Sequence, residues 1–261
     1  MGMESLKKTL PVYKLTDTGW SDFVGYMAKE NISCKEQTDH KQGAPGLYFS
    51  RDGLEFRADA SAWLSRVDFT SSNITHMRRK TLGKRQPLFK AVGINNDIRS
   101  VLDMTAGFLG DAFKLACLNM NVLAYEKSLE VYALAQDGLR RGYLWSEENG
   151  DAELREVLSR IQLHYGDARA VSIPGHIQCI YIDPMFPEKK KGALSGKHMQ
   201  AIQSLSPHAN IEENRQLLEF ALQHNIGRVV VKRPLKQSPL VSGVNHSFEG
   251  KSICYDLYVS N

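Results

Sequence analysis

Residues 177–191 read IQCIYIDPMFPEKKK, an apolar run followed by an acid, two prolines around a phenylalanine, and three lysines. The run from Ile177 to Ile182 has the length and composition of a buried β-strand. Because ligands bind in the loops after buried strands of α/β sheets, the loop beginning at Asp183 is a candidate site. Proline restricts the residue before it to extended conformations, which stiffens the backbone at Asp183 and Phe186. A rigid surface loop is the alternative interpretation.

Strands and helices alternate on both sides of this loop, from about residue 89 to the end of the chain. This alternation predicts an α/β fold, with a mostly parallel sheet and helices on both faces. The last strands are expected to be partly antiparallel. The predicted strands are 100–102, 122–125, 161–165, 177–182, 228–231 and 253–259, and the predicted helices are 112–118, 128–141, 153–160 and 211–224.

Residues 1–88 lack this regular alternation and predict a small, irregular N-terminal α+β extension. Within it, Gly46 to Asp59 is expected to form a β-hairpin, because apolar residues flank a turn at Asp52-Gly53. A further strand is expected at Val67 to Phe69. The chain is therefore divided into residues 1–88 and an α/β domain of residues 89–261.

The 261 residues are enough for one large domain with a small extension, and their composition is ordinary for a folded protein. No stretch approaches the roughly 20 apolar residues of a membrane span, and no secretory signal is recognisable. The four cysteines are widely spaced, with no CxxC motif and no nearby histidine cluster. We therefore expect a cytoplasmic protein without a disulfide, a structural zinc or any other bound metal.

Positive charge is clustered although the net charge is only +4. One cluster precedes the predicted α/β domain and another follows the Asp183 loop. Such clusters create a local field that attracts phosphates, so we expect both to contact the backbone of a nucleic acid, a solvated surface being the alternative. The residues concerned are Arg78, Arg79, Lys80, Lys84, Arg85, Lys189, Lys190 and Lys191.

Three successive predicted strands end in groups that suit a nucleoside cofactor. Asp103 ends the first strand, and Gly107 and Gly110 follow in a loop that lets backbone approach a ligand. Glu126 ends the second strand, where an acid can accept hydrogen bonds from ribose hydroxyls. Asp167 follows the third strand and is placed to hold an amine such as that of adenine. Together they predict a cofactor site along one edge of the sheet.

The choice between NAD and S-adenosylmethionine (SAM) depends on the loop after the first strand. A dinucleotide site normally has the fuller G-x-G-x-x-G motif, with a helix N-terminus facing the pyrophosphate. Here Asp111 opens the helix, and its carboxylate would repel a pyrophosphate but suit a cationic methionine group. The sequence Asp183-Pro184-Met185-Phe186 also resembles the Asp/Asn-Pro-Pro-Tyr/Phe loop of methyltransferases that modify exocyclic amines of bases. SAM is therefore the expected cofactor.

The segments DMTAGFLGDAF, YE, IYIDPMFPEKKK and VVVKRP, in this order and preceded by HMRRK and KAVGI, resemble the ribosomal RNA small-subunit methyltransferase J family. The likeness extends from about Gly46 to the C-terminus. It implies a Rossmann-like SAM-dependent methyltransferase fold and methylation of a guanosine N2 amine in 16S ribosomal RNA. The SAM contacts that it implies are Gly110, Asp111, Glu126, Lys127, Gly166, Asp167 and Asp183.

One departure from the family concerns the cofactor loop. The family commonly reads Gly-Leu-Gly-Arg-Asp where this chain reads Gly107-Phe108-Leu109-Gly110-Asp111. The second glycine is displaced by one position, so Leu109 is expected to bring a Cβ atom close to the cofactor's backbone contacts.

The predicted chemistry assigns three roles to the loop after residue 182. The Asp183 carboxylate and the Pro184 carbonyl are expected to accept hydrogen bonds from the target amine. Phe186 is expected to stack on the base, a contact worth roughly 1–3 kcal/mol. Neither a metal nor a covalent nucleophile is required, because SAM carries an activated methyl group. A paired base cannot present its amine in line, so the target should be unpaired or flipped.

Two other functions are compatible with these residues. One is an adenine-N6 or other amino-methyltransferase acting on nucleic acid, against which Met185 counts, since those enzymes usually have a second proline there. The other is a SAM-free RNA-binding or assembly factor, against which Asp111, Glu126 and Asp183 count. The sequence leaves open the target nucleotide, whether the substrate is naked RNA or an assembled subunit, and the oligomeric state, with a monomer favoured.

Overall fold

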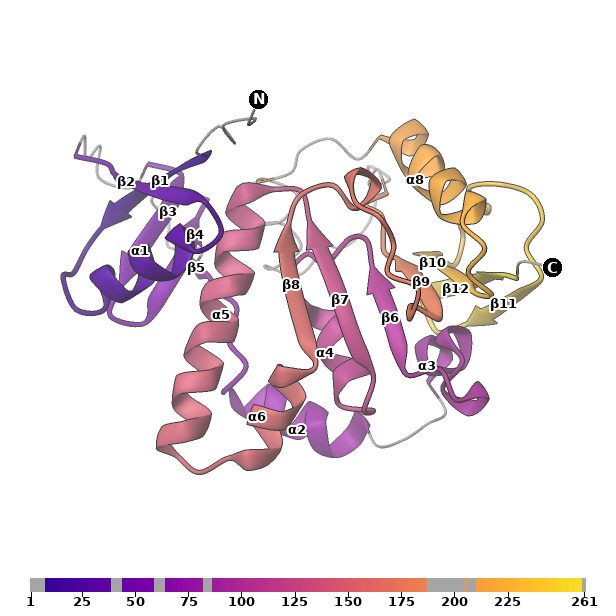
Figure 1. Ribbon diagram of the computed structural model, residues 1–261, viewed down its shortest axis with the longest axis horizontal. Coiled ribbons are helices and arrows are strands. Elements are labelled where there is room, and N and C mark those ends of the chain that lie inside the picture. Colours follow the sequence, from indigo (N-terminus) through magenta and orange to yellow (C-terminus); the bar gives the residue numbers. More distant parts are fainter. Residues whose placement is uncertain are drawn as a thin grey trace.

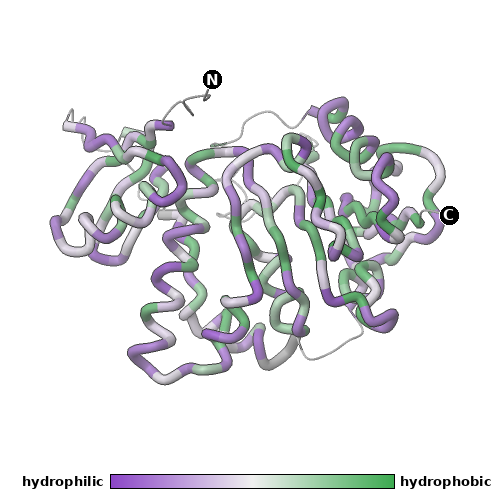
Figure 2. Tube along the Cα trace, in the orientation of Figure 1, coloured by the Kyte–Doolittle hydropathy of each residue, from purple (hydrophilic) through white to green (hydrophobic). Residues whose placement is uncertain are grey.

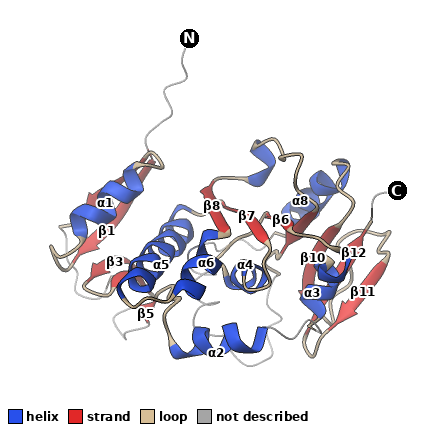
Figure 3. Cartoon of the chain, turned by 60° about the horizontal axis from the view of Figure 1, so that its bottom comes forward, coloured by secondary structure: helices blue, strands red, loops and turns tan. Residues whose placement is uncertain are grey.

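The computed structural model describes residues 8–38, 44–58, 64–81, 86–186, 205 and 210–259. These residues form two sheets, one of five and one of seven strands. Figure 1 shows the smaller, N-terminal sheet at one end of the molecule and the C-terminal strands at the other. The long helix α5 (Leu129–Glu148) lies between the two sheets, as Figure 3 also shows.

The seven-stranded sheet has the order β11-β12-β10-β9-β6-β7-β8. Its strands from β10 to β8 are parallel, whereas β12 pairs antiparallel with both β10 and β11. The predicted α/β fold with a mostly parallel sheet and an antiparallel final pair is therefore confirmed. The strands are β6 (Ser100–Asp103), β7 (Asn121–Glu126), β8 (Ile161–Tyr165), β9 (Cys179–Ile182), β10 (Val229–Pro234), β11 (His246–Glu249) and β12 (Ile253–Tyr258).

Alternate residues of the central strands enter two separate cores, as the two-residue repeat of a strand requires. Tyr181 and Val230 pack with α3, α4, α5 and α6 on one face, whereas Ile180 and Ile182 pack with α8 on the other. Figure 2 shows the apolar residues along these strands. The helices are α3 (Pro87–Val92), α4 (Gly110–Ala116), α6 (Ala152–Ser159) and α8 (Ile211–Gln223), with 3-10 turns η1 (Ile94–Asn96) and η2 (Ala168–Ala170).

The N-terminal sheet is more regular than the sequence predicted. The expected hairpin is confirmed, but a β1-α1-β2 crossover precedes it, so the prediction of an irregular region was wrong. Pro11 lies within β1, and proline counts against a strand when only the sequence is considered. In the structure, β1 pairs with β3 only at Tyr13 and Lys14, so Pro11 interrupts no hydrogen bonds between these two strands. The sheet has the order β2-β1-β3-β4-β5. Its elements are β1 (Lys8–Lys14), α1 (Trp20–Ala28), β2 (Ile32–Glu36), β3 (Gly46–Ser50), β4 (Gly53–Arg57) and β5 (Leu64–Ser65).

The predicted strand from Val67 to Phe69 is also wrong, because these residues follow β5 without joining a ladder. They are buried against helices instead. A Cβ atom on Gly138 of α5 would lie 2.6 Å from Val67 Cγ1, and the Phe69 ring stacks on Phe113 of α4 with 5.0 Å between centroids. The short apolar run therefore reflects helix packing, which periodicity alone cannot distinguish from a strand.

The predicted domain boundary at residue 88 falls inside α3. This helix packs against β11 and β12, so it belongs with the larger sheet. The two parts are joined through Asp137 of α5, which is fully buried. Its Oδ2 atom accepts hydrogen bonds from the backbone N–H of Leu54 in β4, at 2.8 Å, and from Arg141 Nε, at 2.7 Å.

Across the described residues, no helix is both long enough and apolar enough to cross a membrane. The four cysteines are free thiols, two of them buried. No group of three or more histidine, cysteine, aspartate or glutamate side chains in this part of the chain is arranged to hold a metal ion.

Candidate active site

A cavity of about 540 Å³ opens where the parallel strands β6 to β10 end. This volume is within the usual range for small-molecule sites. All of the predicted cofactor and catalytic residues line it, because the carboxyl ends of parallel strands meet at one edge of the sheet. These residues are Asp103, Gly107, Gly110, Asp111, Glu126, Lys127, Gly166, Asp167, Asp183, Pro184 and Phe186.

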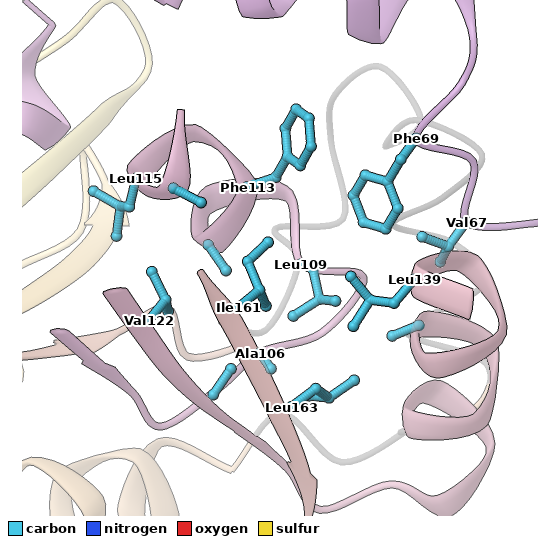
Figure 4. Close-up of a cluster of buried hydrophobic side chains, with 14 of the residues drawn as sticks. Val67, Phe69, Ala106, Leu109, Phe113, Leu115, Val122, Leu139, Ile161 and Leu163 are labelled. Atoms are coloured by element: carbon cyan, nitrogen blue, oxygen red, sulfur yellow. The ribbon is translucent and has the colours of Figure 1, made fainter. Parts of the chain in front are cut away.

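The displaced glycine leaves Leu109 in a left-handed conformation, with φ of 61°, immediately before α4. Its side chain is fully buried and does not line the cavity. Figure 4 shows it among Ala106, Ile161 and Leu163 in the core. The expectation that its Cβ atom would crowd the cofactor was therefore wrong. The left-handed backbone costs about 1–2 kcal/mol, which burial of a leucine side chain can offset with about 1.5–3 kcal/mol.

Glu126 organises the glycine loop from the end of β7. Its Oε2 atom accepts a hydrogen bond from the N–H of Gly107 and its Oε1 atom one from the N–H of Ser128, both at 2.8 Å. Burial raises the pKa of this carboxyl group, while the two backbone hydrogen bonds oppose the rise. The carboxylate oxygens retain lone pairs that can accept hydrogen bonds from ribose hydroxyls.

Asp103 lies deeper, at the end of β6, and is 2 % exposed. Its Oδ1 atom accepts a hydrogen bond from the N–H of Thr105 at 3.0 Å. Burial raises its pKa to about 7, and the negative charges of Asp111 and Asp183 act in the same direction. A buried carboxylate of this kind favours a cationic ligand, which would restore its ionised form.

Asp111 is not the free carboxylate that the sequence suggested. Lys114 Nζ and Lys232 Nζ lie 2.7 Å and 2.8 Å from its two oxygens, and the Tyr181 hydroxyl donates to Oδ2 at 2.7 Å. Burial alone would raise the pKa of Asp111, but the two ammonium groups hold it below its usual range. Its charge is thus already compensated, so Asp103 is the better candidate for a cationic methionine group.

Asp183 is held at both its backbone and its side chain. Its N–H donates to Thr105 Oγ1 at 2.6 Å, and its Oδ2 atom lies 2.7 Å from Lys232 Nζ. Burial raises its pKa, and the charge of Lys232 opposes this rise. No described residue donates a hydrogen bond to Oδ1. Sequence reasoning missed Lys232 and Thr105, although a lysine within the apolar run VVVKRP was a signal.

The rest of the Asp183 loop is supported by α8. The side-chain amide of Asn214 donates to the carbonyl oxygen of Met185 at 2.8 Å, while Phe186 packs partly buried against the core beneath that helix. Asn214 was also missed, because nothing in the sequence relates the first turn of α8 to this loop. Pro187 and the predicted RNA contacts Lys189, Lys190 and Lys191 lie outside the described residues.

At the other end of the cavity, Asp167 is engaged by a neighbour. Both of its oxygens accept from Arg169, whose Nη2 lies 2.5 Å from Oδ2, and this pairing lowers the pKa of Asp167. An adenine amine would share the carboxylate with that arginine. Lys127 forms an ion pair with Glu213 of α8, with 2.5 Å between Nζ and Oε1. The predicted cofactor roles of Asp167 and Lys127 stay predictions.

The basic N-terminal cluster is placed differently from what we expected. Arg78 is in α2 (Ser72–Thr81), is 7 % exposed, and donates two hydrogen bonds to Asp151 at the start of α6. Figure 1 shows α2 near the end of the sheet opposite the carboxyl ends of the strands. A buried and paired guanidinium does not reach a phosphate, so the predicted RNA contact of Arg78 is corrected to a structural one. The side chains of Arg79, Lys80, Lys84 and Arg85 are outside the described part.

Comparison with known proteins agrees with this geometry. The family described as putative SAM-dependent methyltransferases matches residues 31–260. The ribosomal RNA small subunit methyltransferase J of Saccharophagus degradans is 40 % identical over 85 % of this chain and 86 % of its own length. That of Dechloromonas aromatica is 36 % identical over 94 % of this chain and 90 % of its own.

A solved structure supports the same assignment. The crystal structure of a SAM-dependent methyltransferase from Neisseria gonorrhoeae is similar, with a TM-score of 0.70, 26 % identity and 95 % coverage of both chains. Its fold and the sequence matches over most of the chain agree with the cavity at the carboxyl ends of the strands. The chain therefore belongs to the ribosomal RNA small subunit methyltransferase J family of SAM-dependent methyltransferases.

Proposed function

We propose that this protein methylates the exocyclic N2 amine of a guanosine in small-subunit (16S) ribosomal RNA, with SAM as the methyl donor. One observation carries the proposal: Asp183, on a loop stiffened by Pro184, lines the same cavity as Glu126 and Asp103, and no described residue donates a hydrogen bond to its Oδ1 atom. The names of the relatives supply the substrate class, because they are small-subunit ribosomal RNA methyltransferases.

The cavity suits SAM on chemical grounds. Glu126 offers acceptors for a ribose diol, and Asp103 offers a buried anion for a cationic methionine group. Bound there, SAM supplies a methyl group on a positively charged sulfur. The backbone of the glycine loop is open at Gly110, where an added Cβ atom would meet nothing within 4 Å. The loop can therefore approach a ligand closely.

The chemistry proposed for this chain is alignment and charge stabilisation. Guanine N2 is a weak nucleophile, because its lone pair is delocalised into the ring. The carboxylate of Asp183 and the carbonyl of Pro184 accept hydrogen bonds from the amine, which orients its lone pair and stabilises the positive charge that develops on nitrogen. Alignment of this kind can contribute about 7–11 kcal/mol. A bound SAM would supply the methyl group to the amine nitrogen and keep the electron pair of the broken carbon–sulfur bond on sulfur, and one amine proton would pass to water.

Phe186 is proposed to stack on the target base beside the amine. Its ring lies on the loop that Asn214 ties to α8, so its position is set by two separate elements. Stacking needs an exposed base face, and an in-line amine needs an unpaired base. The target guanosine is therefore proposed to be single-stranded or flipped out of a helix.

Ribosomal RNA from cells with and without the gene tests this function. Nucleoside mass analysis should show one N2-methylguanosine in small-subunit RNA that disappears without the gene. It should return with the wild-type gene and fail to return with Asp183→Asn. A missing methyl group on adenine would indicate the adenine-N6 alternative. No difference in methylation would favour an assembly factor. Purified protein, offered naked RNA or assembled subunits, would identify the substrate form.

RNA contact by the remaining basic residues is part of this proposal, as is a cytoplasmic location, where ribosomal RNA is found. Replacing Arg79 and Lys80 together with glutamine should weaken RNA binding and flatten its dependence on salt. Arg78→Gln is the matched comparison, because its charge is paired with Asp151. An unchanged salt slope in the double variant would remove this segment from the RNA interface.

A further inference from the structure

Lys232 connects two carboxylates of the cavity that come from distant parts of the chain. Its Nζ atom lies 2.8 Å from Asp111 Oδ2 and 2.7 Å from Asp183 Oδ2. The lysine projects from β10, which pairs in parallel with β9, the strand that ends at the Asp183 loop. Its side chain is only 21 % exposed, so the ammonium group is part of the cavity wall.

The two carboxylates depend on Lys232 to different degrees. Asp111 has two further donors, Lys114 Nζ and the Tyr181 hydroxyl. The Asp183 side chain has Lys232 as its only hydrogen-bond donor among the described residues. Loss of Lys232 would therefore leave Asp111 anchored, but Asp183 free to rotate and close to another negative charge.

We propose that Lys232 is a positioning residue for methyl transfer, which holds Asp183 Oδ2 so that Oδ1 faces the target amine and keeps this carboxylate ionised. The inference rests on the proposed role of Asp183 as the acceptor. Lys232 is not a catalytic residue in this scheme, because it acts on the reaction through Asp183. Nor does it relay a proton, since the two carboxylates raise its pKa above the usual range despite burial.

The charged groups around Asp183 support the proposal that Lys232 keeps this carboxylate ionised. Asp183 faces the carboxylates of Asp111 and Asp103 and the ammonium groups of Lys232 and Lys114, with the Tyr181 and Tyr255 hydroxyls nearby. Burial and Asp111 raise the pKa of Asp183, whereas Lys232 is the largest influence that lowers it. Carboxylates that share a site without a cation cannot easily both ionise. Without Lys232, Asp183 would therefore hold a proton at higher pH.

The same pairing explains how a cavity that contains a positively charged lysine can bind a positively charged cofactor. The charges of Lys232 and Lys114 are matched by those of Asp111 and Asp183, so the cluster as a whole does not repel a sulfonium. Removing Lys232 should consequently lower turnover without weakening SAM binding. Removing a residue that served only to bind SAM would instead weaken SAM binding without lowering turnover at saturating SAM.

The test compares Lys232→Met, Lys232→Arg and Lys114→Met by the pH dependence of kcat, at saturating labelled SAM with the RNA substrate. In Lys232→Met, the acid limb of the profile should move to higher pH, because the carboxylate whose ionised form is needed has lost its cation. On the acid limb, where turnover follows the ionised fraction, each unit by which the pKa of Asp183 rises should lower turnover about tenfold at a given pH. Lys232→Arg keeps the charge and should restore the position of the acid limb. Lys114→Met should move it less, because Lys114 contacts Asp111 alone.

Two results would overturn the inference. One is a folded Lys232→Met enzyme whose profile superimposes on that of the wild type. The other, which serves if Lys232→Met does not fold, is a folded Lys232→Arg enzyme with the acid limb displaced. Calorimetry of SAM binding shows whether the loss is one of cofactor affinity, which would also count against it. Mapping the methylated nucleotide tests the proposed function separately, because a product other than N2-methylguanosine contradicts that function whatever the pH profile shows.

Discussion

Two carboxylates of this protein have the same chemistry but different surroundings. Asp137, between the two sheets, has every oxygen occupied: Oδ2 accepts from Leu54 and Arg141, and Oδ1 from Arg140. Asp183, at the carboxyl edge of the larger sheet, lines the cavity with one oxygen held by Lys232, while no donor to the other oxygen is found among the described residues. A saturated carboxylate can only stabilise the fold, whereas an incompletely paired one can act on a ligand.

The difference follows from position in the fold. Asp137 lies in the middle of α5 against β4, is fully buried and does not line the cavity. Asp183 lies where a parallel strand ends, and neighbouring strands contribute further polar groups around a cavity. Substitution of Asp137 should therefore lower stability, whereas substitution of Asp183 should lower activity.

The largest effect is expected from Asp137→Ala. It leaves the charges of Arg140 and Arg141 and the N–H of Leu54 without their partner in a buried place. Removing one member of such a network costs about 3–5 kcal/mol of unfolding free energy. Urea unfolding measures this loss. Asp52→Ala, which breaks an exposed pair with Arg66, is the control and should change stability by less than about 1 kcal/mol. Equal midpoints for the two variants would contradict the structural role of Asp137.

Asp183→Asn should show the reverse pattern, with a folded protein that has lost turnover. The amide keeps the shape of the carboxylate, but it accepts hydrogen bonds less strongly and can turn a donor toward the amine. We expect kcat to fall roughly a hundredfold or more, with a small change in KM for RNA, because the interaction strengthens in the transition state. Steady-state assays at saturating SAM, with melting curves as the fold check, measure both quantities. Near-wild-type turnover would exclude Asp183 as the acceptor.

Glu126→Ala should affect cofactor affinity rather than turnover at saturation. It removes the acceptors for the ribose and releases the N–H of Gly107. Loss of a hydrogen bond to a charged group corresponds to about 1.5–3 kcal/mol of SAM binding free energy, measurable by calorimetry. Glu130→Ala is a matched control, because Glu130 is an acid near the same strand end that does not line the cavity. If both variants bind SAM like the wild type, Glu126 is not a cofactor residue.

The smallest effect is expected from Asp103→Asn. This substitution should increase stability, whereas Asp137→Ala should decrease it. The folded protein raises the pKa of Asp103 from an ordinary 3.8 to about 7, so it binds more protons than the unfolded chain between these values. Stability of the wild type should then fall as pH rises through this range. The variant lacks this penalty and should be more stable than the wild type at pH 8, with little difference at pH 4.

The same variant should bind SAM more weakly and lack the decline in affinity that we expect of the wild type as pH falls below about 7. Thermal melting without SAM and calorimetry at several pH values test the two expectations together. A variant less stable than the wild type at pH 8 would show that the Asp103 carboxylate is structural.

The sequence alone determined the order of strands and helices from residue 100 onward and the positions of the acids that line the cavity. Asp103, Glu126, Asp167 and Asp183 each follow a predicted strand, and parallel strands bring such positions to one edge without any knowledge of side-chain packing. The hairpin was predictable for a related reason, because an Asp-Gly turn between apolar runs is a local signal.

Only the tertiary structure decided which charges pair. Lys232 is 121 residues from Asp111 and 49 from Asp183, and Arg78 is 73 residues from Asp151. Pairing over such separations depends on how helices and strands pack, which no local pattern encodes. Leu109 illustrates the same limit, since its left-handed backbone is stabilised by a core drawn from several elements. Sequence therefore determined where the functional groups lie along the sheet edge, and packing decided which of them remain free to meet a ligand.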